Sequence, residues 1–372
     1  MGSALTALER AERFCDRFGP AIPVLQAPMA GACPPGLAIA VVRAGGMGAA
    51  GIVQDTPERI LAWAAQVRAA TPGPFQLNTW IPDPSTDDAR REAAARRFLA
   101  ALAGDAALTA PDADPEPGPR PGPAGPGAPD FAEQCEAMLA ARPSAVSSVM
   151  GLFPAEYVRR VTAAGIAWFA TVTTVAEGLA AQEAGASAVV AQGIEAGGHR
   201  GTFDPAVAER VGVGLFALVP RLADRLEIPV VAAGGIADGR GAAAALLLGA
   251  SAVQVGTALL RSPEAGADPA WAGELSGLEP ETPCLTSAYS GRPGRAVPTA
   301  FVRAWQGADA PPPAPYPAQR RLVAKRRRDG APGVDAVNHW AGQSAALARR
   351  APAGDVVRDL WTEARSLLRP GA

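Results

Sequence analysis

One histidine of the chain stands in a sequence context that suits proton transfer. His199 lies in AVVAQGIEAGGHRGTF (188–203), where a buried apolar run leads into a loop with Gly198 before the histidine and Gly201 shortly after it. Such a loop offers an imidazole little apolar packing, so a purely structural role is less natural than usual. Because an unperturbed imidazole titrates near ~6.5, it can accept a proton at neutral pH without special tuning. We therefore predict that His199 is a catalytic base.

The second of the 2 histidines, His339, precedes Trp340 in a pattern typical of a helix. That context fits a satisfied core histidine better than a functional one. The 4 cysteines lie far apart and form no Cys-x-x-Cys pair and no Cys/His spacing typical of a metal site. We expect reduced thiols and no metal ion.

Two glycine turns are candidates for binding a phosphate group. The apolar run PVVAA ends in Gly234 and Gly235, and Asp238 follows as the expected start of a helix. The next apolar run ends in Gly256 and Thr257. Glycines let backbone N–H groups approach an anion, and a helix N-terminus adds the positive end of its dipole. The open alternative is that these glycines serve only helix–sheet packing.

Neutral polar residues stand at the ends of two other apolar runs. Asn78 in QLNTW and Gln192 in VVAQG offer amide donors and acceptors, which suit the ring edge or ribityl chain of a flavin better than a metal. Capping of exposed strand ends is the alternative. The run GGMGAAG has the spacing of a dinucleotide-binding loop, but it follows a helical pattern and leads into a strand, which is the wrong order for that fold.

The elements that must position these residues alternate regularly between Ile22 and Leu260. Short apolar runs alternate with Ala- and Leu-rich stretches of helical spacing, and eight such runs can be counted. Unbroken apolar strands separated by helices indicate a parallel sheet, and eight units favour closure into a (β/α)8 TIM barrel. The runs are IPVLQAPM at 22, MGAAGIV at 47, FQLNTWI at 75, AVSSVMG at 145, AWFATV at 167, AVVAQG at 188, PVVAAGG at 229 and AVQVGTALL at 252.

The remaining chain departs from this rhythm. We expect a barrel over 1–262, interrupted by a Pro/Gly-rich loop at 111–130, and a loop-rich, helical segment over 263–372 that contributes to the substrate pocket. Helical patterns stand within 336–350 and 355–368. In the barrel, Thr174 and Asp238 are expected N-caps, and Gly165 and Gly185 are expected to end helices.

The charge balance excludes some classes of partner. The formal net charge is -2, which predicts neither a nucleic-acid nor an anionic-membrane footprint, and the basic run Lys325 to Arg328 is read as a solvated surface. No apolar stretch reaches the ~20 residues of a membrane span, and the first residues lack the apolar run of a signal peptide. We expect a cytoplasmic protein, with a homodimer as an open possibility.

Three stretches resemble signature motifs of a known family. PVLQAPMAG, AVVAQGIEAGGHRG and LVPRLADRLEIPVVAAGGIADGRG are similar to three of the four motifs of class I nitronate monooxygenases, formerly called 2-nitropropane dioxygenases. The likeness spans roughly residues 20 to 300. The fourth motif departs from the family pattern, since Ser148 stands where the family usually has Phe. This change bears on substrate preference more than on flavin binding.

The resemblance implies a bound FMN, with His199 as the base. By matched position, it implies substrate contacts at Ser148, Tyr289, Arg292 and Arg295. It implies FMN contacts at Gln26, Ala27, Pro28, Met29, Asn78, Gln192, Gly197, Gly198, Gly234, Gly235, Gln254, Val255, Gly256 and Thr257.

The implied reaction is oxidation of alkyl nitronates, and of nitroalkanes after loss of the α-proton to His199, by O2 to a carbonyl compound and nitrite. Two alternatives stay open. One is an FMN- and NAD(P)H-dependent enoyl-acyl-carrier-protein or quinone reductase. The other is a flavin- or phosphate-binding module without redox turnover.

Overall fold

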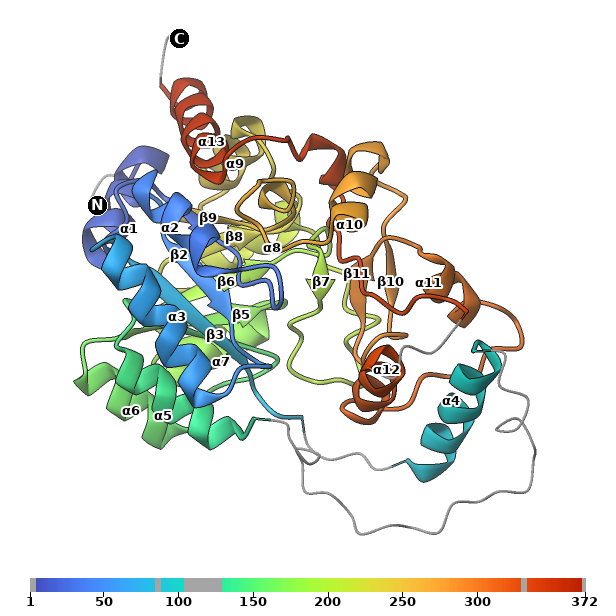
Figure 1. Ribbon diagram of the computed structural model, residues 1–372. Coiled ribbons are helices and arrows are strands. Elements are labelled where there is room, and N and C mark those ends of the chain that lie inside the picture. The colour runs from blue at the N-terminus through green and yellow to red at the C-terminus, as the bar shows by residue number, and fades with distance from the viewer. Residues whose placement is uncertain (1–4, 84–87, 104–128, 329–332, 370–372) are drawn as a thin grey trace.

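The computed structural model describes residues 5–83, 88–103, 129–328 and 333–369, and its main body is a sheet of parallel strands surrounded by helices (Figure 1). All eight predicted strands are confirmed, each within a predicted apolar run. In the sheet they follow the order β1-β9-β8-β6-β5-β4-β3-β2. They are β1 (Val24–Gln26), β2 (Gly48–Gly51), β3 (Phe75–Trp80), β4 (Ala145–Val149), β5 (Ala167–Val172), β6 (Ala188–Gln192), β8 (Val230–Ala233) and β9 (Ala252–Val255).

The first and last strands of that order meet and close the sheet into a barrel. Leu25 of β1 forms a parallel bridge with Met47, and the amide of Gln26 donates to the carbonyl of Met47 at 2.9 Å. The side-chain amide of Gln26 then donates to the carbonyl of Ala49 at 2.8 Å, which extends the seam toward the carboxyl ends of the strands. The predicted (β/α)8 barrel class is confirmed.

Alternation along the strands separates two apolar layers. Leu25, Phe169 and Val190 point into the barrel, where they pack with Phe14 and Phe18 of α1 (Ala7–Phe18). Helix α1 therefore plugs the amino-terminal end of the barrel, since Phe18 meets Phe169 edge to face at 5.0 Å. The opposite, carboxyl-terminal end is the one left for chemistry, as in other barrels of this kind.

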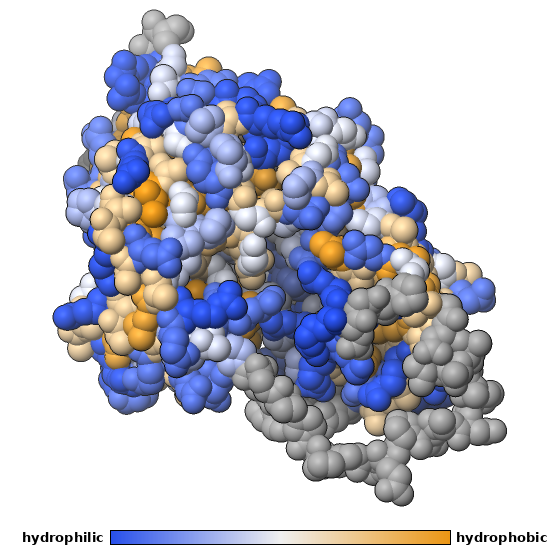
Figure 2. All heavy atoms as spheres, viewed as in Figure 1, coloured by the Kyte–Doolittle hydropathy of each residue, from blue (hydrophilic) through white to orange (hydrophobic). Residues whose placement is uncertain are grey.

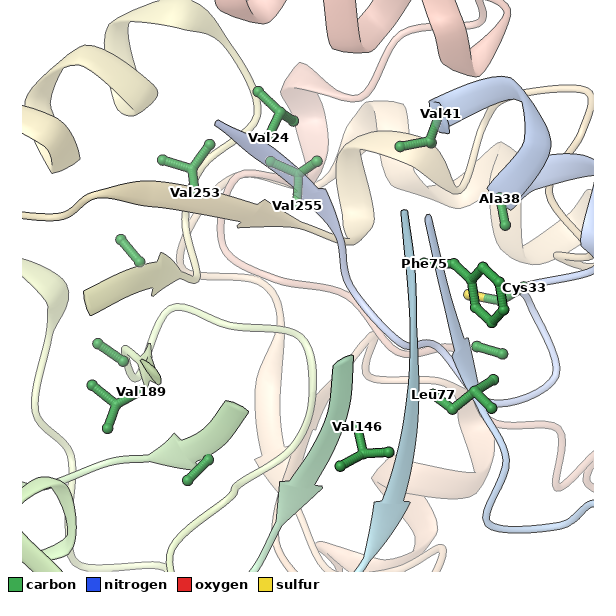
Figure 3. Packing of buried hydrophobic residues seen from close by; sticks show 14 of the residues in the cluster. Val24, Cys33, Ala38, Val41, Phe75, Leu77, Val146, Val189, Val253 and Val255 are labelled. Carbon is green, nitrogen blue, oxygen red and sulfur yellow. The ribbon is translucent and has the colours of Figure 1, made fainter. Parts of the chain in front are cut away.

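The other face of each strand packs against the surrounding helices. Val24, Val146, Val189 and Val253 belong to this outer cluster, which Figure 3 shows together with Val41 of α2. The helices that cover the barrel are α2 (Pro35–Arg43), α3 (Pro57–Ala70), α5 (Phe131–Ala141), α6 (Ala155–Ala163), α7 (Val175–Glu183), α8 (Leu215–Ala223) and α9 (Gly239–Leu247).

Local signals in the sequence set the ends of these helices. Thr174 caps α7 in a capping box with Glu177, and Asp238 caps α9 by accepting from the amide of Gly241 at 3.0 Å. Gly165 and Gly185 follow α6 and α7 with φ of 72° and 94°, a left-handed conformation that only glycine adopts at little cost. These predictions are confirmed.

A second, smaller core lies beside the barrel mouth. Its sheet pairs β7 (Gly198–His199) with β11 (Gly294–Ala296), which pairs in turn with β10 (Cys284–Thr286). Helices α11 (Ala300–Trp305), α12 (Ala318–Arg328) and α4 (Ala89–Ala101) complete it, and α4 packs on α12 although more than 200 residues separate them in sequence (Figure 1). Its apolar residues include Leu99, Phe301 and Val323.

The packing divides the chain differently from the predicted boundary at 262. Helix α4, which follows β3, belongs to the smaller core, whereas α13 (Ala353–Leu367) packs back on α9 and α2 of the barrel. The helix expected within 355–368 is therefore present as α13. Between the two units run η2 (Thr257–Leu259), α10 (Pro269–Glu274) and η3 (Leu275–Gly277).

The prediction of a helix within 336–350 is wrong. Trp340 forms an antiparallel bridge with Ala296, and the carbonyl of His339 accepts from the amide of Val297 at 2.8 Å, so this stretch runs extended beside β11. Only the short η4 (Ala345–Leu347) is helical there. Residues 111–128 of the expected Pro/Gly-rich loop lie outside the described residues. Within the described ranges, no helix is long and apolar enough to cross a membrane.

Candidate active site

The carboxyl-terminal half of the barrel interior is polar. Two of the predicted cofactor residues, Asn78 and Gln254, extend the inward-facing rows of β3 and β9. The amide of Gln76 donates to Gln254 Oε1 at 3.1 Å, and Asn78 Nδ2 donates to the hydroxyl of Ser147 at 3.0 Å. Because β3 and β9 are not neighbours in the sheet, the bond between Gln76 and Gln254 spans the barrel interior, and both side chains are buried there with Asn78.

The side-chain amide of Gln192 is fully engaged with the loop that carries His199. Its Oε1 accepts from Arg200 Nη1 at 3.1 Å and from the amide of Gly201 at 2.8 Å, while its Nε2 donates to the carbonyl of His199 at 2.9 Å. Arg200 is fully buried and also donates to the carbonyl of Gly193 at 2.8 Å. The side chain of Gln192 therefore clamps the loop that carries His199, a different role from the flavin contact expected for it.

The imidazole of His199 lies between two indoles. The ring centroids of Trp80 and Trp340 are each 4.6 Å from that of His199. Its Nε2 lies 2.7 Å from the hydroxyl of Ser290. No hydrogen bond to Nδ1 is found among the described residues, so this nitrogen is the one that remains for a ligand.

The surroundings of His199 favour the neutral ring. Burial, followed by the positive charges of Arg320 and Arg292, lowers the pKa of His199 from its ordinary value to about 3. The environment thus shifts the imidazole away from the ordinary pKa on which the sequence-based expectation rested. The ring stays neutral at any pH near 7 and keeps a lone pair, although it is a weaker base than a free imidazole.

A cationic and aromatic wall stands behind Trp80. The ring of Tyr316 lies 5.6 Å from that of Trp80, and the guanidinium of Arg320, from α12, lies 5.6 Å from the same indole. Arg320 also donates to the hydroxyl of Tyr316 at 3.3 Å. Figure 2 shows a hollow on this face between the barrel and α12, bordered by hydrophilic residues. The smaller core thus supplies one side of the site.

Arg292 holds the smaller core onto the barrel. It forms a bidentate ion pair with Asp83, in which Nε donates to Oδ2 at 2.7 Å, and it donates to the carbonyl of Thr202 at 2.9 Å. Both partners of the ion pair are almost fully buried. Since these bonds commit the guanidinium to protein groups, we assign Arg292 a structural role in place of the expected substrate contact.

The other expected substrate residues are also engaged with protein. Arg295 donates to the carbonyls of Ile194 and Pro283 at 3.0 and 2.5 Å, and the hydroxyl of Tyr289 lies 3.0 Å from that of Thr299. Ser148 points outward from β4, where its hydroxyl accepts from the indole N–H of Trp168 at 3.0 Å. Their side chains support the site from behind, and the structure does not bring the Ser148 hydroxyl to His199.

The predicted phosphate turns come together at the barrel mouth. Gly234 and Gly235 follow β8 with φ of 121° and 65°, and a Cβ on Gly234 would lie 3.0 Å from the amide nitrogen of Ala196. A Cβ on Gly256 would lie 3.2 Å from the Cβ of Ala27 and 3.4 Å from the sulfur of Met29. A side chain at Gly234 would crowd Ala196, and one at Gly256 would crowd Ala27 and Met29, so glycine keeps the backbone of both turns accessible.

Segments distant in sequence close this cradle. Val255 accepts from the amide of Ala27 at 2.8 Å, which fixes the Gln26–Met29 stretch, including Pro28, beside β9. Thr257 Oγ1 accepts from the amide of Gly342 at 3.1 Å. A Cβ on Gly197 would lie 2.5 Å from that same nitrogen. The stretch after Trp340 therefore crosses the mouth between the loops that follow β6 and β9.

These residues fit a flavin mononucleotide. Its phosphate needs backbone N–H groups at glycine turns, which Gly234, Gly235 and Gly256 provide. Its ring and ribityl chain need neutral donors and acceptors, which Gln76, Asn78 and Gln254 provide. Among the residues that the structure describes, the buried Oε1 of Gln76 has no hydrogen-bond partner, and a bound polar group would satisfy this acceptor. No group of three His, Cys, Asp or Glu side chains within the described residues could hold a metal ion.

Several residues of the site escaped prediction from sequence. Ser290 stands between Tyr289 and Arg292, inside a motif that was singled out, and Trp80 follows Asn78 by two positions. A polar residue inside such a motif and an aromatic one at a strand end were signals that could have found both. Nothing in the spacing indicates Arg320 or Tyr316, because their positions depend on how α12 packs.

His339 fits the expectation of a satisfied histidine better than that of a functional one, since its side chain is 12% exposed and paired. Its Nδ1 lies 2.8 Å from a carboxylate oxygen of Glu274, and its ring stacks on Trp271 at 6.2 Å. Trp271 and Glu274, both of α10, therefore hold the His339 ring beside that helix.

Fold and site together define a class: a (β/α)8-barrel enzyme with its chemistry at the carboxyl ends of the strands. The sequence profile of the nitronate monooxygenase family matches residues 12–363. A nitronate monooxygenase from Pseudomonas aeruginosa is 40% identical over 95% of this chain and 99% of its own length. The chain therefore belongs to the nitronate monooxygenase family and is an oxidoreductase.

Solved structures agree with this assignment. The nitroalkane oxidase from Streptomyces ansochromogenes superposes with a TM-score of 0.79 at 33% identity, covering 96% of this chain and 99% of that one. FabK from Thermotoga maritima superposes with a TM-score of 0.71 at 26% identity, covering 98% of both chains. The barrel and the smaller core thus recur together in both proteins.

Proposed function

We propose that this protein uses FMN to oxidise alkyl nitronates, and nitroalkanes, with O2 to a carbonyl compound and nitrite. The observation that carries the proposal is the neutral imidazole of His199, which is held between two indoles beside a cradle of glycine turns. Membership of the nitronate monooxygenase family supports the same chemistry.

Different residues at the mouth of the barrel would bind different parts of the cofactor and substrate. Gly234, Gly235 and Gly256 hold the phosphate, while Asn78 and Gln254 meet the polar edge of the cofactor. When bound, FMN supplies one-electron oxidation of the nitronate, with O2 as the final electron acceptor. The indoles of Trp80 and Trp340, each 4.6 Å from the imidazole, shield it from water and offer apolar contact to an alkyl group.

His199 prepares a neutral nitroalkane for oxidation. The α-carbon of the nitroalkane loses its proton to the imidazole, which becomes an imidazolium, and the carbon–hydrogen electron pair remains on the substrate as the nitronate. A substrate that arrives as a nitronate needs no such step. Arg320, which disfavours the imidazolium, also favours an anion bound nearby, so it stabilises the nitronate as it forms.

Nitrite release tests the proposal directly. The purified protein should be yellow and, with propionate 3-nitronate in air, should release nitrite without NADH, whereas little nitrite should form without O2. A protein that instead needs NADH and bleaches its flavin rapidly on mixing is a reductase. A protein that binds flavin but is inert to nitronates, NADH and quinones is a binding module.

A further inference from the structure

The hydroxyl of Ser290 has three hydrogen-bonding neighbours, one of which is the ring of His199. It lies 2.7 Å from His199 Nε2, 3.2 Å from the backbone nitrogen of Arg292 and 3.2 Å from the backbone carbonyl of Arg292. The side chain is buried, so no bulk water competes for these positions. Which atoms donate can therefore be decided by counting protons.

A serine hydroxyl has one proton to donate and two lone pairs to accept with. The amide of Arg292 can only donate, so it fills one lone pair. The carbonyl of Arg292 can only accept, so it takes the hydroxyl proton. The one position left on Ser290 is a lone pair, and it faces Nε2 of His199.

We propose that Ser290 fixes the tautomer of His199, with the proton on Nε2 and the lone pair on Nδ1. The opposite arrangement, in which the hydroxyl donates to Nε2, would leave the carbonyl of Arg292 without the only side-chain donor found for it among the described residues. Leaving a buried acceptor unpaired costs more than a hydrogen bond gains, so the first arrangement prevails.

The consequence for catalysis is that Nδ1 is the atom that takes the substrate proton, with Ser290 as a positioning residue. The catalytic part of this inference rests on the proposed function, whereas the tautomer itself does not. On protonation the imidazolium carries N–H groups on both nitrogens, and Nε2–H continues to donate to Ser290. No bond to Ser290 has to break, so the ring keeps its orientation between Trp80 and Trp340 while the proton moves.

The clamp on the other side of His199 supports this fixed orientation. Gln192 holds the carbonyl of His199, and Arg200 and Gly201 fix the amide of Gln192 in turn. The backbone pairing of β7 with β11 sets His199 opposite Gly294. The ring and the backbone of His199 are therefore held by independent contacts. Of these contacts, the one to Ser290 distinguishes the two ring nitrogens.

Nitrogen NMR of the histidine rings tests the tautomer. With 15N-histidine in the full chain, the 2 histidines give two sets of ring signals, and His339→Gln identifies those of His199. At pH 7 we expect a protonated, pyrrole-type signal from Nε2 and an unprotonated, pyridine-type signal from Nδ1. Finding the proton on Nδ1 in the unsubstituted protein would overturn the proposal.

Substitution of Ser290 supplies a second readout. Ser290→Ala should shift the His199 signals toward a mixture of tautomers, and Ser290→Thr, which keeps the hydroxyl, should restore the single form. With nitroethane, kcat/KM should fall about tenfold in Ser290→Ala, the size expected for loss of one hydrogen bond, while the value with ethyl nitronate should stay close to that of the parent. Unchanged ring signals in folded Ser290→Ala would contradict the assignment.

The two proposals fail separately. A protein that releases no nitrite from any nitronate but shows the proton on Nε2 disproves the proposed reaction and leaves the tautomer standing. A protein that releases nitrite but carries the proton on Nδ1 keeps its function and loses the role given to Ser290.

Discussion

At the scale of single residues, the site depends on keeping one imidazole neutral. Burial of His199 beside two indoles, followed by the charges of Arg320 and Arg292, lowers its pKa to about 3. A protonated ring could not accept a proton, so under the proposed function a neutral ring would be ready to act as the base even in mildly acid solution. Under the proposed function, its lower basicity would be offset in the transition state by stabilisation of the nitronate, for which Arg320 is the candidate cation.

Replacing Arg320 should raise the pKa of His199. In Arg320→Gln one of the two guanidinium charges that lower the pKa of His199 is lost, so the imidazolium becomes less unfavourable and the pKa moves up toward its ordinary value. Titration of the His199 ring signals by NMR measures the shift. Arg321→Gln, the neighbouring position on α12, is the matched control and should leave the titration unchanged. A downward shift in Arg320→Gln would contradict the assigned cause.

At the scale of elements, the barrel strands could be predicted and the small sheet could not. Each barrel strand is an apolar run buried on both faces, which is a local signal. The two-residue β7 has no such signal, since it exists only because His199 and Gly198 pair with β11 almost a hundred residues later. The helical pattern around Trp340 led to a wrong prediction for the same reason. Pairing of Trp340 with Ala296 outweighs the local preference of this stretch for a helix.

The ion pair between Asp83 and Arg292 should be a strong link between these elements. Asp83→Asn leaves a buried guanidinium without its countercharge, so we expect a loss of about 3 kcal/mol in the free energy of unfolding, measured by denaturant titration. The surface pair of Arg349 and Asp359 gives the control, because Asp359→Asn should cost at most about 1 kcal/mol. Equal losses in the two variants would refute the role given to Arg292.

At the scale of the whole molecule, one chain builds two cores that share the site. The sequence placed His199 and the glycine turns correctly at the barrel mouth, because the ends of successive strands must meet there. It could not place Trp80, Ser290 and Arg320 around the imidazole, since that depends on the smaller core docking against the barrel. It also could not show that α13 returns to the barrel after the chain has left it.

This return makes the end of the chain part of the barrel. Leu360 of α13 is buried against the outer cluster, so Leu360→Ala should lower the free energy of unfolding by about 2–5 kcal/mol. Leu367, on the same helix but 55% exposed, is the control, and Leu367→Ala should change it by less than about 0.5 kcal/mol. Thermal or urea unfolding measures both. If the two variants lose the same stability, α13 is not held as described.

The most direct test of the account compares two substrates in one variant. In His199→Asn, kcat/KM for nitroethane should fall by about 100-fold or more, the usual contribution of a general base, whereas kcat/KM for ethyl nitronate should stay within a few fold of the parent value. Nitrite release measures both, with His339→Asn as the matched control. An equal loss on the two substrates would contradict the role of His199 as the base.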